Sequence, residues 1–223
     1  MCPHSIRSRN IAAVAAVLAV ALCLPALAAG DASSSPFWGL EQVPSKNVAV
    51  LYRRPDSDLS AYGKIMIGEP AVEFAKNWNA RNYGTYGLSA EQLKRIRTDL
   101  AALAKTTFAQ VLGAGGYEIV TEAGDGVLLI TPNIVNLFIS APDVQGPGRT
   151  KTFSMEAGSA SLALQVNDAV SGTLLAVVLD SKRSGQSALR WTTGVSNRAA
   201  AGVLLKNWAE QLKRELDEAR ANY

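Results

Sequence analysis

The most regular alternation of apolar and polar positions in the chain lies between Ala157 and Asp180. In its first half every second residue is apolar, a period typical of a strand with one buried face. These residues are Ala160, Leu162, Leu164 and Val166. Turn-forming residues follow at 167–168 and 171–172. Residues 174–179 are then all apolar, so we expect a hairpin whose second strand is buried on both faces.

Two other stretches have the period of an amphipathic helix. Ser89 and Gln92 have the spacing of a capping box, and Gly113 is expected to end the first helix as a left-handed cap. The apolar stripe between them comprises Leu93, Ile96, Leu100, Leu103, Thr107 and Val111, with Ala104 and Phe108 beside it. The second helix is predicted from about Asn197 to Arg220. Its stripe consists of Leu204, Trp208, Leu212 and Leu216, widened by Leu205 and Ala209, and it places Trp208 in the core.

Shorter apolar runs predict further strands at 46–52, 64–74, 117–121, 127–140 and 189–193. Pro70 is expected to break the second run or place it at a sheet edge, and the fourth is expected to kink or bulge near Pro132-Asn133. Strands dominate, and only one crossover contains a helix. This favours an α+β fold, a mostly antiparallel or mixed sheet with two long helices packed on one face. A three-layer arrangement with a helix on each face stays open.

The beginning of the chain has the form of a secretory signal. Arg7 and Arg9 precede an apolar stretch at 11–24, and Ala26-Leu27-Ala28 fits a cleavage site. The apolar stretch is short for a membrane span. We therefore expect a signal peptide at 1–28, a flexible spacer at 29–45 and a single domain at 46–223. The mature protein is expected to be periplasmic or secreted, with no transmembrane helix after cleavage.

Cleavage would change the chemistry that the chain can perform. The only histidine, His4, and both cysteines, Cys2 and Cys23, lie within the predicted signal. The mature chain would then lack Ser-His and Cys-His nucleophiles and disulfides. An alternative is acylation of Cys23, which would make the protein an outer-membrane lipoprotein. Leu22 stands before Cys23, where lipoprotein signals carry a small residue.

Charge and motifs exclude several other classes. The net charge of +3, with no cluster of basic and aromatic residues, gives no indication of nucleic-acid binding. Neither a P-loop nor a Gly-x-Gly-x-x-Gly motif is present. A zinc site in the mature chain would need carboxylate ligands alone, which is unusual. We therefore assign no catalytic residue, no cofactor and no metal ligand.

Paired carboxylates are the remaining route to catalysis. Glu69 with Glu73, or Asp143 with Glu156, could in principle supply a general acid and base. The simpler interpretation is that these are surface and turn carboxylates, because nothing in the sequence indicates a shifted pKa. Whether the protein is an enzyme stays open, and the absence of other reactive groups weighs against it.

Two loops carry the candidate partner-binding residues. The segment 78–86 is rich in Asn and Gly and holds Trp78, Tyr83 and Tyr86, which could stack on a ligand or partner. Such aromatic residues can instead cover a sheet edge or seal a helix. The Gly/Pro-rich loop at 141–151 holds Asp143 and Arg149. Asp143 can equally be explained as a turn residue that caps backbone amides.

Several short motifs in order resemble the bacterial domain-of-unknown-function 3313 family, a set of exported or lipidated envelope proteins. The matching residues are Tyr52-Arg53-Arg54-Pro55, Leu59, Tyr62, Lys64, Trp78, Gly116-Tyr117, Val120, Asn136, Ala141-Pro142-Asp143, Ala157-Gly158, Ala160, Asp168, Gly172, Asp180, Val195-Ser196-Asn197-Arg198 and Trp208-Ala209. The resemblance covers about Tyr52 to Leu216. It implies an envelope location and brings no assigned activity.

Together these observations favour a non-catalytic envelope protein that binds another envelope protein or component through its loops. One alternative is a carboxylate-only hydrolase acting on envelope glycans, which would need two carboxylates converging in a cleft. Another is a lipid-handling accessory protein, which would need an apolar groove between the helices and the sheet. The sequence leaves the strand order, the oligomeric state and the partner open.

Overall fold

A computed structural model describes residues 37, 39–55, 57–82, 87–139, 153–154, 158–184, 190–191 and 194–221. All of them belong to one compact unit, Ser35–Tyr223. The predicted signal peptide, including Cys23, lies outside the described residues. Within the described part of the chain, neither long helix combines the length and the apolar character that a membrane span requires.

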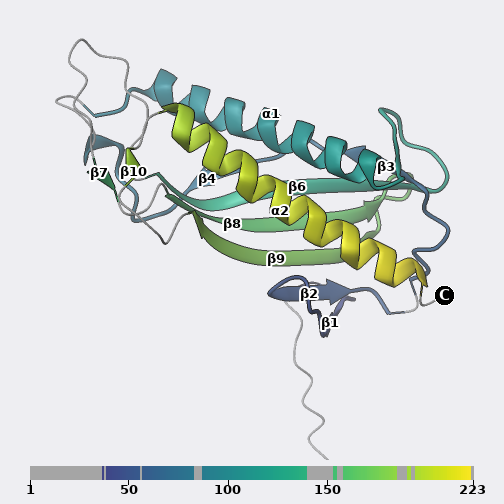
Figure 1. The fold of residues 1–223 in the computed structure, drawn as a ribbon. Coiled ribbons are helices and arrows are strands. Elements are labelled where there is room, and N and C mark those ends of the chain that lie inside the picture. The colour runs from purple at the N-terminus through teal and green to yellow at the C-terminus, as the bar shows by residue number, and fades with distance from the viewer. Residues whose placement is uncertain are drawn as a thin grey trace, which may run out of the picture. The chain divides into compact units, whose positions relative to one another are not determined.

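The central element is a mixed β-sheet (Figure 1). Its strands follow the order β1 (Glu41–Val43), β2 (Val50–Arg53), β9 (Leu174–Ser184), β8 (Gly158–Asp168), β6 (Val127–Ile139), β3 (Lys64–Ile67) and β5 (Glu118–Ile119), with β4 (Val72–Phe74) also paired to β6. The pairings β3–β5, β3–β6 and β4–β6 are parallel, and the others are antiparallel. A separate antiparallel pair is formed by β7 (Phe153–Ser154) and β10 (Arg190–Trp191).

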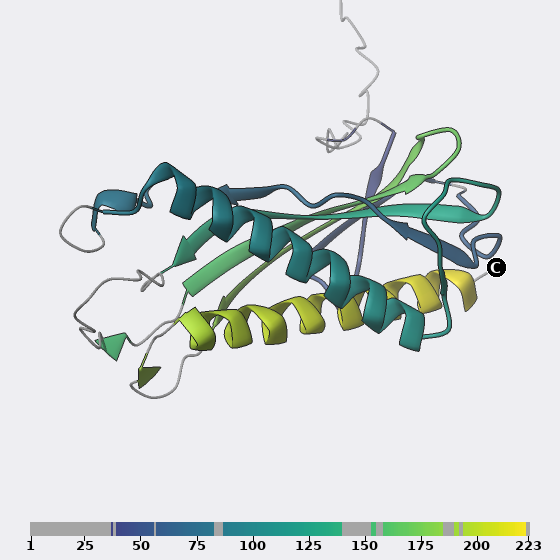
Figure 2. The same cartoon turned by 90° about the horizontal axis from the view of Figure 1, so that it is seen from above.

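Two long helices, α1 (Ala90–Ala114) and α2 (Gly194–Ala221), cover the same face of this sheet and contact each other (Figures 1 and 2). A short 3-10 helix, η1 (Ala80–Asn82), precedes α1. The predicted α+β class is therefore confirmed. The alternative with one helix on each face is wrong, because both amphipathic stripes bury against one side of the sheet.

The hairpin that dominates the sequence pattern forms as predicted. Along β8 the buried residues are Ala160, Leu162, Leu164 and Val166, while the residues between them are partly or fully exposed. On β9 the run from Leu175 to Val178 is buried. This strand lies between β8 and β2, so both of its edges are hydrogen-bonded within the sheet. At the turn Gly172 has φ +71°, a conformation that a side chain would strain.

Pro70 interrupts the strand predicted at 64–74, which divides into β3 and β4 on either side of it. Across this break, Gly68 N donates to Ile130 O (2.9 Å) and Ile134 N donates to Ala71 O (2.8 Å). Pro132 lies midway between those two β6 residues, so its missing N–H faces the break between β3 and β4. A proline is therefore tolerated in the middle of this strand without loss of a ladder hydrogen bond.

The predicted bulge in this strand lies at a different position. The β6–β8 register shifts between Val135 and Phe138, not at Pro132-Asn133, and Asn136 has φ +52°. Asn is one of the few residues that adopt the left-handed region at low cost, and the extra residue of a bulge often needs it.

The start of α1 agrees with prediction and its end does not. Ser89 and Gln92 form the capping box, with Gln92 N donating to Ser89 Oγ (3.2 Å) and Ser89 N donating to Gln92 Oε1 (2.8 Å). The helix continues past Gly113 to Ala114, and Gly116 takes the left-handed conformation with φ +96°. The most buried line of α1 is Ala104, Phe108 and Leu112, displaced slightly from the predicted stripe.

The folded unit begins earlier than the predicted spacer allows. Glu41–Val43 forms β1 and pairs with β2, and Leu40 before it is only 2% exposed. The C-terminal part of the predicted spacer is thus part of the sheet. The short, partly polar sequence E-Q-V gave little strand signal because an edge strand has only one paired side.

Candidate binding site

One end of the sheet brings together the ends of several elements. Figure 1 shows the start of α1, the start of α2, and strands β7 and β10 at this end. Strand β6 reaches it at Ile139 and β4 reaches it at Phe74. The turn after β4 carries Trp78, the one predicted partner-binding residue within the described part of the chain.

Trp78 is held in place from three directions. Its indole ring stacks on the ring of Phe74, with centroids 4.3 Å apart and planes inclined by 12°. Its Nε1 donates to the backbone carbonyl of Ile139 (3.0 Å). Its backbone N donates to Ala75 O (2.9 Å), and Ala75 N donates to Leu137 O (2.9 Å). The tryptophan is thus tied to both β4 and β6, and it is half-buried.

A cation completes the cluster. The guanidinium carbon of Arg97, on α1, lies 5.1 Å from the centroid of the Phe74 ring. This distance is within the range of a cation–π interaction. At exposed sites such an interaction is worth about 0.5–1 kcal/mol. The packing of α1 against β4 brings Arg97 over Phe74. We call Phe74, Trp78 and Arg97 the aromatic cluster.

The other predicted site residues fall on segments that the structure does not describe. Tyr83, Tyr86, Asp143 and Arg149 lie outside the described residues, as does Glu156. Their predicted role in binding stays a prediction. Phe74 and Arg97, in contrast, were absent from the sequence prediction. The motif F-A-K-N-W puts two aromatic residues four apart, but only the packing of α1 against β4 shows that an arginine joins them.

Of the two predicted carboxylate pairs, only Glu69 with Glu73 lies within the described residues. Glu69 forms an ion pair with Lys105 of α1, and both side chains are well exposed. Glu73, on the short strand β4, is also exposed. Among the described residues no group of three or more His, Cys, Asp and Glu side chains is arranged to hold a metal ion.

Asp180 is the one buried charged residue in the described part of the chain, and its role is structural. It faces α2 from β9 and is 8% exposed. Its Oδ2 accepts from Trp208 Nε1 (3.0 Å), and its Oδ1 accepts from the Ser181 backbone N (2.9 Å). The contact joins the centre of α2 to the sheet. An Asp at the end of the apolar run 174–179 is the sequence signal that could have indicated it.

A second carboxylate, Asp168, closes the turn of the hairpin. Its Oδ1 accepts from the backbone N of Ser171 (2.6 Å) and of Val170 (3.1 Å) and from Ser171 Oγ (2.7 Å), and its Oδ2 accepts from Tyr62 OH (2.9 Å). These bonds, first those from Ser171 and then that from Tyr62, lower the pKa of Asp168. Burial, and after it Asp168, raises the pKa of the Tyr62 phenol.

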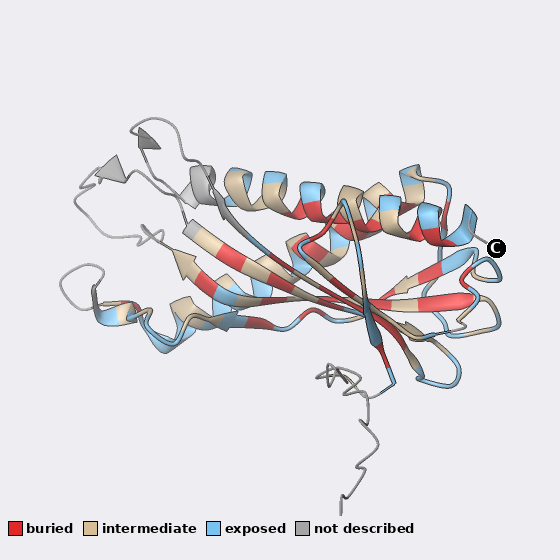
Figure 3. Ribbon diagram, turned by 90° about the horizontal axis from the view of Figure 1, so that it is seen from below, coloured by how far each residue is buried: buried red, intermediate tan, exposed pale blue. Residues whose placement is uncertain are grey.

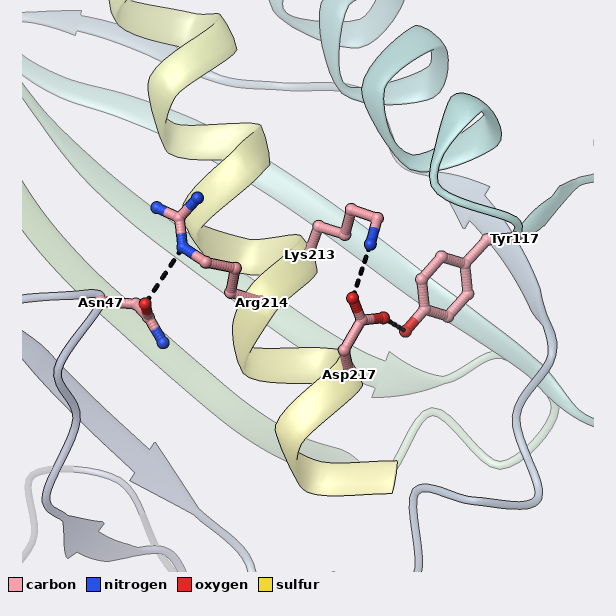
Figure 4. A network of polar contacts seen from close by, with 5 residues as sticks. All are labelled: Asn47, Tyr117, Lys213, Arg214 and Asp217. Atoms are coloured by element: carbon pink, nitrogen blue, oxygen red, sulfur yellow. Dashed lines mark hydrogen bonds and ion pairs between the residues drawn. The ribbon is translucent and has the colours of Figure 1, made fainter. Parts of the chain in front are cut away.

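A polar network at the C-terminal part of α2 fastens this helix to the segment between α1 and β5 and to the segment before β2 (Figure 4). Tyr117 OH donates to Asp217 Oδ1 (3.0 Å), and Lys213 Nζ donates to Asp217 Oδ2 (2.6 Å). Arg214 Nε donates to Asn47 Oδ1 (3.0 Å). Burial raises the pKa of the Tyr117 phenol. These groups hold α2 against its neighbouring segments.

Comparisons with known proteins agree with the resemblance seen in the sequence. The model of the family described as "Protein of unknown function (DUF3313)" matches residues 32–212. Among curated proteins, none matches the chain.

Several solved structures are similar at low identity. The PelC dodecamer from Paraburkholderia phytofirmans is 9% identical over 70% of this chain and 94% of that one, with a TM-score of 0.38. A neuraminyllactose-binding hemagglutinin homolog from Helicobacter pylori is 12% identical over 74% and 90%, with a TM-score of 0.34. A DUF4136 family protein from Bacteroides thetaiotaomicron is 10% identical over 78% and 97%, with a TM-score of 0.32. Likeness at this level carries no argument about function.

Proposed function

The chain belongs to the DUF3313 family, whose members are proteins of unknown function, and from this premise we propose that it is an exported cell-envelope protein. We propose further that it binds another envelope component through the aromatic cluster and catalyses no reaction. The export proposal rests on the charged and apolar pattern at the beginning of the chain. The binding proposal rests on the geometry of Trp78.

The observation that carries the binding proposal is the rigid placement of Trp78 at the end of the sheet. Binding surfaces favour aromatic side chains whose position is fixed before the partner arrives, because little conformational entropy is then lost. Trp78 meets this condition through the stack on Phe74 and the bond to Ile139 O. Arg97 adds a positive charge, so the favoured partner surface is one that offers apolar area beside an acidic or hydroxyl group.

The structural use of the described carboxylates supports the non-catalytic part of the proposal. Asp180 and Asp168 accept hydrogen bonds that hold a helix and a turn, and Glu69 is neutralised by Lys105. A carboxylate-only hydrolase needs two carboxyl groups roughly 5–10 Å apart across a substrate. Within the described residues, no observation favours that alternative over binding.

A site-specific crosslinking experiment tests the binding proposal. A photo-reactive amino acid replaces Asn79, which is exposed next to Trp78, and in a matched control it replaces Val170 at the hairpin turn, which is 63% exposed. Val170 lies at the other end of the sheet, since Asp168 pairs with Leu128 at the start of β6. We expect a discrete crosslinked product in cells from position 79 and none from position 170. Equal products from both positions, or none from either, would refute the assignment of the site.

Export is tested separately, by reading the N-terminus of the protein recovered from the envelope. Cleavage after Ala28 gives a chain that begins at Ala29. Acylation gives a chain that begins with a lipid-modified Cys23. A cytoplasmic protein that still begins at Met1 would refute export while leaving the binding assignment to be judged by the crosslinks.

A further inference from the structure

The end of the sheet that carries Trp78 is rich in exposed positive charge. Lys76 precedes Trp78 by two residues, and Arg81 follows it in η1. Lys94 lies one turn before Arg97 on the same side of α1, because residues three apart on a helix are neighbours. All four basic residues are exposed. We call Lys76, Arg81, Lys94 and Arg97 the basic rim.

Backbone contacts hold the segments of the basic rim beside one another. Leu88 N donates to Ala80 O (2.9 Å), which ties η1 to the residues just before α1. Gly87 lies so close to η1 that a Cβ atom on it would be 2.8 Å from the Cα of Arg81. The aromatic cluster in turn joins α1 to β4. The basic rim therefore gathers at one end of the molecule, next to the aromatic cluster.

Within the described residues, few carboxylates balance these charges. Glu91, in the first turn of α1, is exposed and precedes Lys94 by three residues. Glu73 belongs to β4, but the alternation along a strand directs it to the side opposite Phe74. The ion pairs in the described part of the chain lie elsewhere, at Lys105–Glu69, Lys206–Glu210 and Lys213–Asp217. The basic rim thus keeps most of its positive charge.

The other end of the sheet carries the opposite charge. Strand β6 spans about 40 Å at about 3.3 Å per residue, and Trp78 is bonded at its Ile139 end. At its Val127 end, four carboxylates and one lysine lie on the neighbouring strands and turns: Glu118, Glu122, Asp125, Asp168 and Lys64. Figure 3 shows exposed positions in pale blue at both ends of the sheet. The described domain is therefore polarised along β6.

We propose that the basic rim and Trp78 dock on the surface of a membrane that contains anionic lipids, with the acidic end directed away from it. This inference rests on the proposed function and names its partner, since the envelope component bound by the aromatic cluster is then a lipid surface. Charge complementarity favours this partner, because anionic headgroups attract exposed lysine and arginine side chains and repel the acidic end.

The aromatic cluster matches the boundary between headgroups and acyl chains. Tryptophan is enriched at membrane–water interfaces, where an apolar ring lies beside polar groups. Trp78 satisfies its own N–H inside the protein, through the bond to Ile139 O, so its ring can enter apolar surroundings without leaving that donor unpaired. The four cations are distributed over η1, the turn before it and α1. This distribution suits a layer of headgroups better than a single acidic side chain.

Binding to lipid vesicles tests the inference. The protein purified from cells that express the full-length sequence is sedimented with vesicles of phosphatidylcholine, or of phosphatidylcholine with about 30% phosphatidylglycerol, which makes the surface negative. We expect stronger binding to the anionic vesicles. Raising the NaCl concentration from about 0.1 M to about 0.5 M should remove the difference, because salt screens exposed charges.

Two double variants with the same change in net charge locate the contact. Lys76→Gln with Lys94→Gln removes two cations of the basic rim. Lys46→Gln with Lys64→Gln removes two exposed lysines far from Trp78. Each cation near an anionic surface strengthens binding roughly fivefold, so the first double variant should bind at least about tenfold more weakly and the second like wild type. All variants share one N-terminus, so its contribution cancels, and thermal unfolding shows that they are folded.

The outcomes distinguish this inference from the proposed function. Equal binding to neutral and anionic vesicles, or an equal loss in both double variants, would overturn the lipid assignment. If the photo-reactive group at position 79 then crosslinks to a protein, the proposed binding site stands and that protein is its partner. If position 79 gives no crosslink and the anionic vesicles are not preferred, both proposals fail.

Discussion

The two tryptophans Trp78 and Trp208 use the same atom in opposite ways. Each donates a hydrogen bond of 3.0 Å from Nε1. Trp208 donates to the buried carboxylate of Asp180 and is 1% exposed in the middle of the core. Trp78 donates to a backbone carbonyl at the end of a strand and is half-buried. The comparison shows that a hydrogen-bonded indole can hold a core or present a surface, depending on what its ring faces.

The largest expected effect is a difference in the free energy of unfolding between alanine variants of the two tryptophans. Trp208→Ala removes a fully buried ring and should cost about 3–5 kcal/mol of the free energy of unfolding. Trp78→Ala removes a half-exposed ring and one stacking partner, and should cost roughly 1–2 kcal/mol. Urea denaturation of both variants measures the difference. Equal losses would show that Trp78 is a core residue and would remove the basis for the comparison.

The next effect concerns the acceptor of the buried indole. Asp180→Ala leaves the N–H of Trp208 without its carboxylate partner and should cost about 1–3 kcal/mol. In the Trp208→Phe background the donor is already gone, so the same substitution at Asp180 should cost less. A double-mutant cycle measured by urea denaturation gives the coupling energy. Strictly additive effects would contradict a direct role of this hydrogen bond.

How far the sequence predicts each region follows from the range of the interactions involved. The hairpin and the capping box depend on residues close together in the chain, and both formed as predicted. The sequence placed the bulge at Pro132 rather than Asn136, because a proline is expected to disrupt a strand. In the structure Pro132 lies opposite the break between β3 and β4, where it disrupts nothing. The pattern around Pro132 holds no information about that neighbouring strand.

The site was less predictable than the fold for the same reason. Trp78 was identified because aromatic residues in a loop are noticeable in any sequence. Arg97 looks like one more charged residue on a helix, and only the packing of α1 against β4 brings it over Phe74. In the sequence Asp180 likewise looks like the end of a strand, and only the structure shows its contact with α2.

A smaller effect on stability is expected at the hairpin turn, where a carboxylate accepts hydrogen bonds from uncharged donors. Because the folded-state pKa of Asp168 is lowered, its ionised form stabilises the fold above the unfolded-state pKa of about 3.9. That stabilisation is lost as the pH falls through the lower folded-state pKa. Tyr62→Phe removes one donor, so its stability deficit relative to wild type should be present near neutral pH and shrink in acid. Thermal unfolding between about pH 2 and pH 7 measures this. A deficit that is independent of pH would contradict it.

The smallest expected effect on stability is that of Arg97→Gln. It removes the cation above Phe74 and should cost no more than about 0.5–1 kcal/mol of the free energy of unfolding. If the aromatic cluster binds the partner as proposed, the effect of Arg97→Gln on crosslinking from position 79 should be larger than its effect on stability. Lys105→Gln, on the same helix, is the matched control. Equal loss of crosslinks in both variants would indicate a general effect of charge rather than a role for the aromatic cluster.

The most direct test of the account combines both readouts in a single variant. Trp78→Ala carrying the photo-reactive group at position 79 is assayed for crosslinked product in cells and for thermal unfolding after purification. We expect a folded protein that has lost the product seen with Trp78 present. A folded variant that still gives the full yield of that product would contradict the claim that Trp78 forms the binding surface.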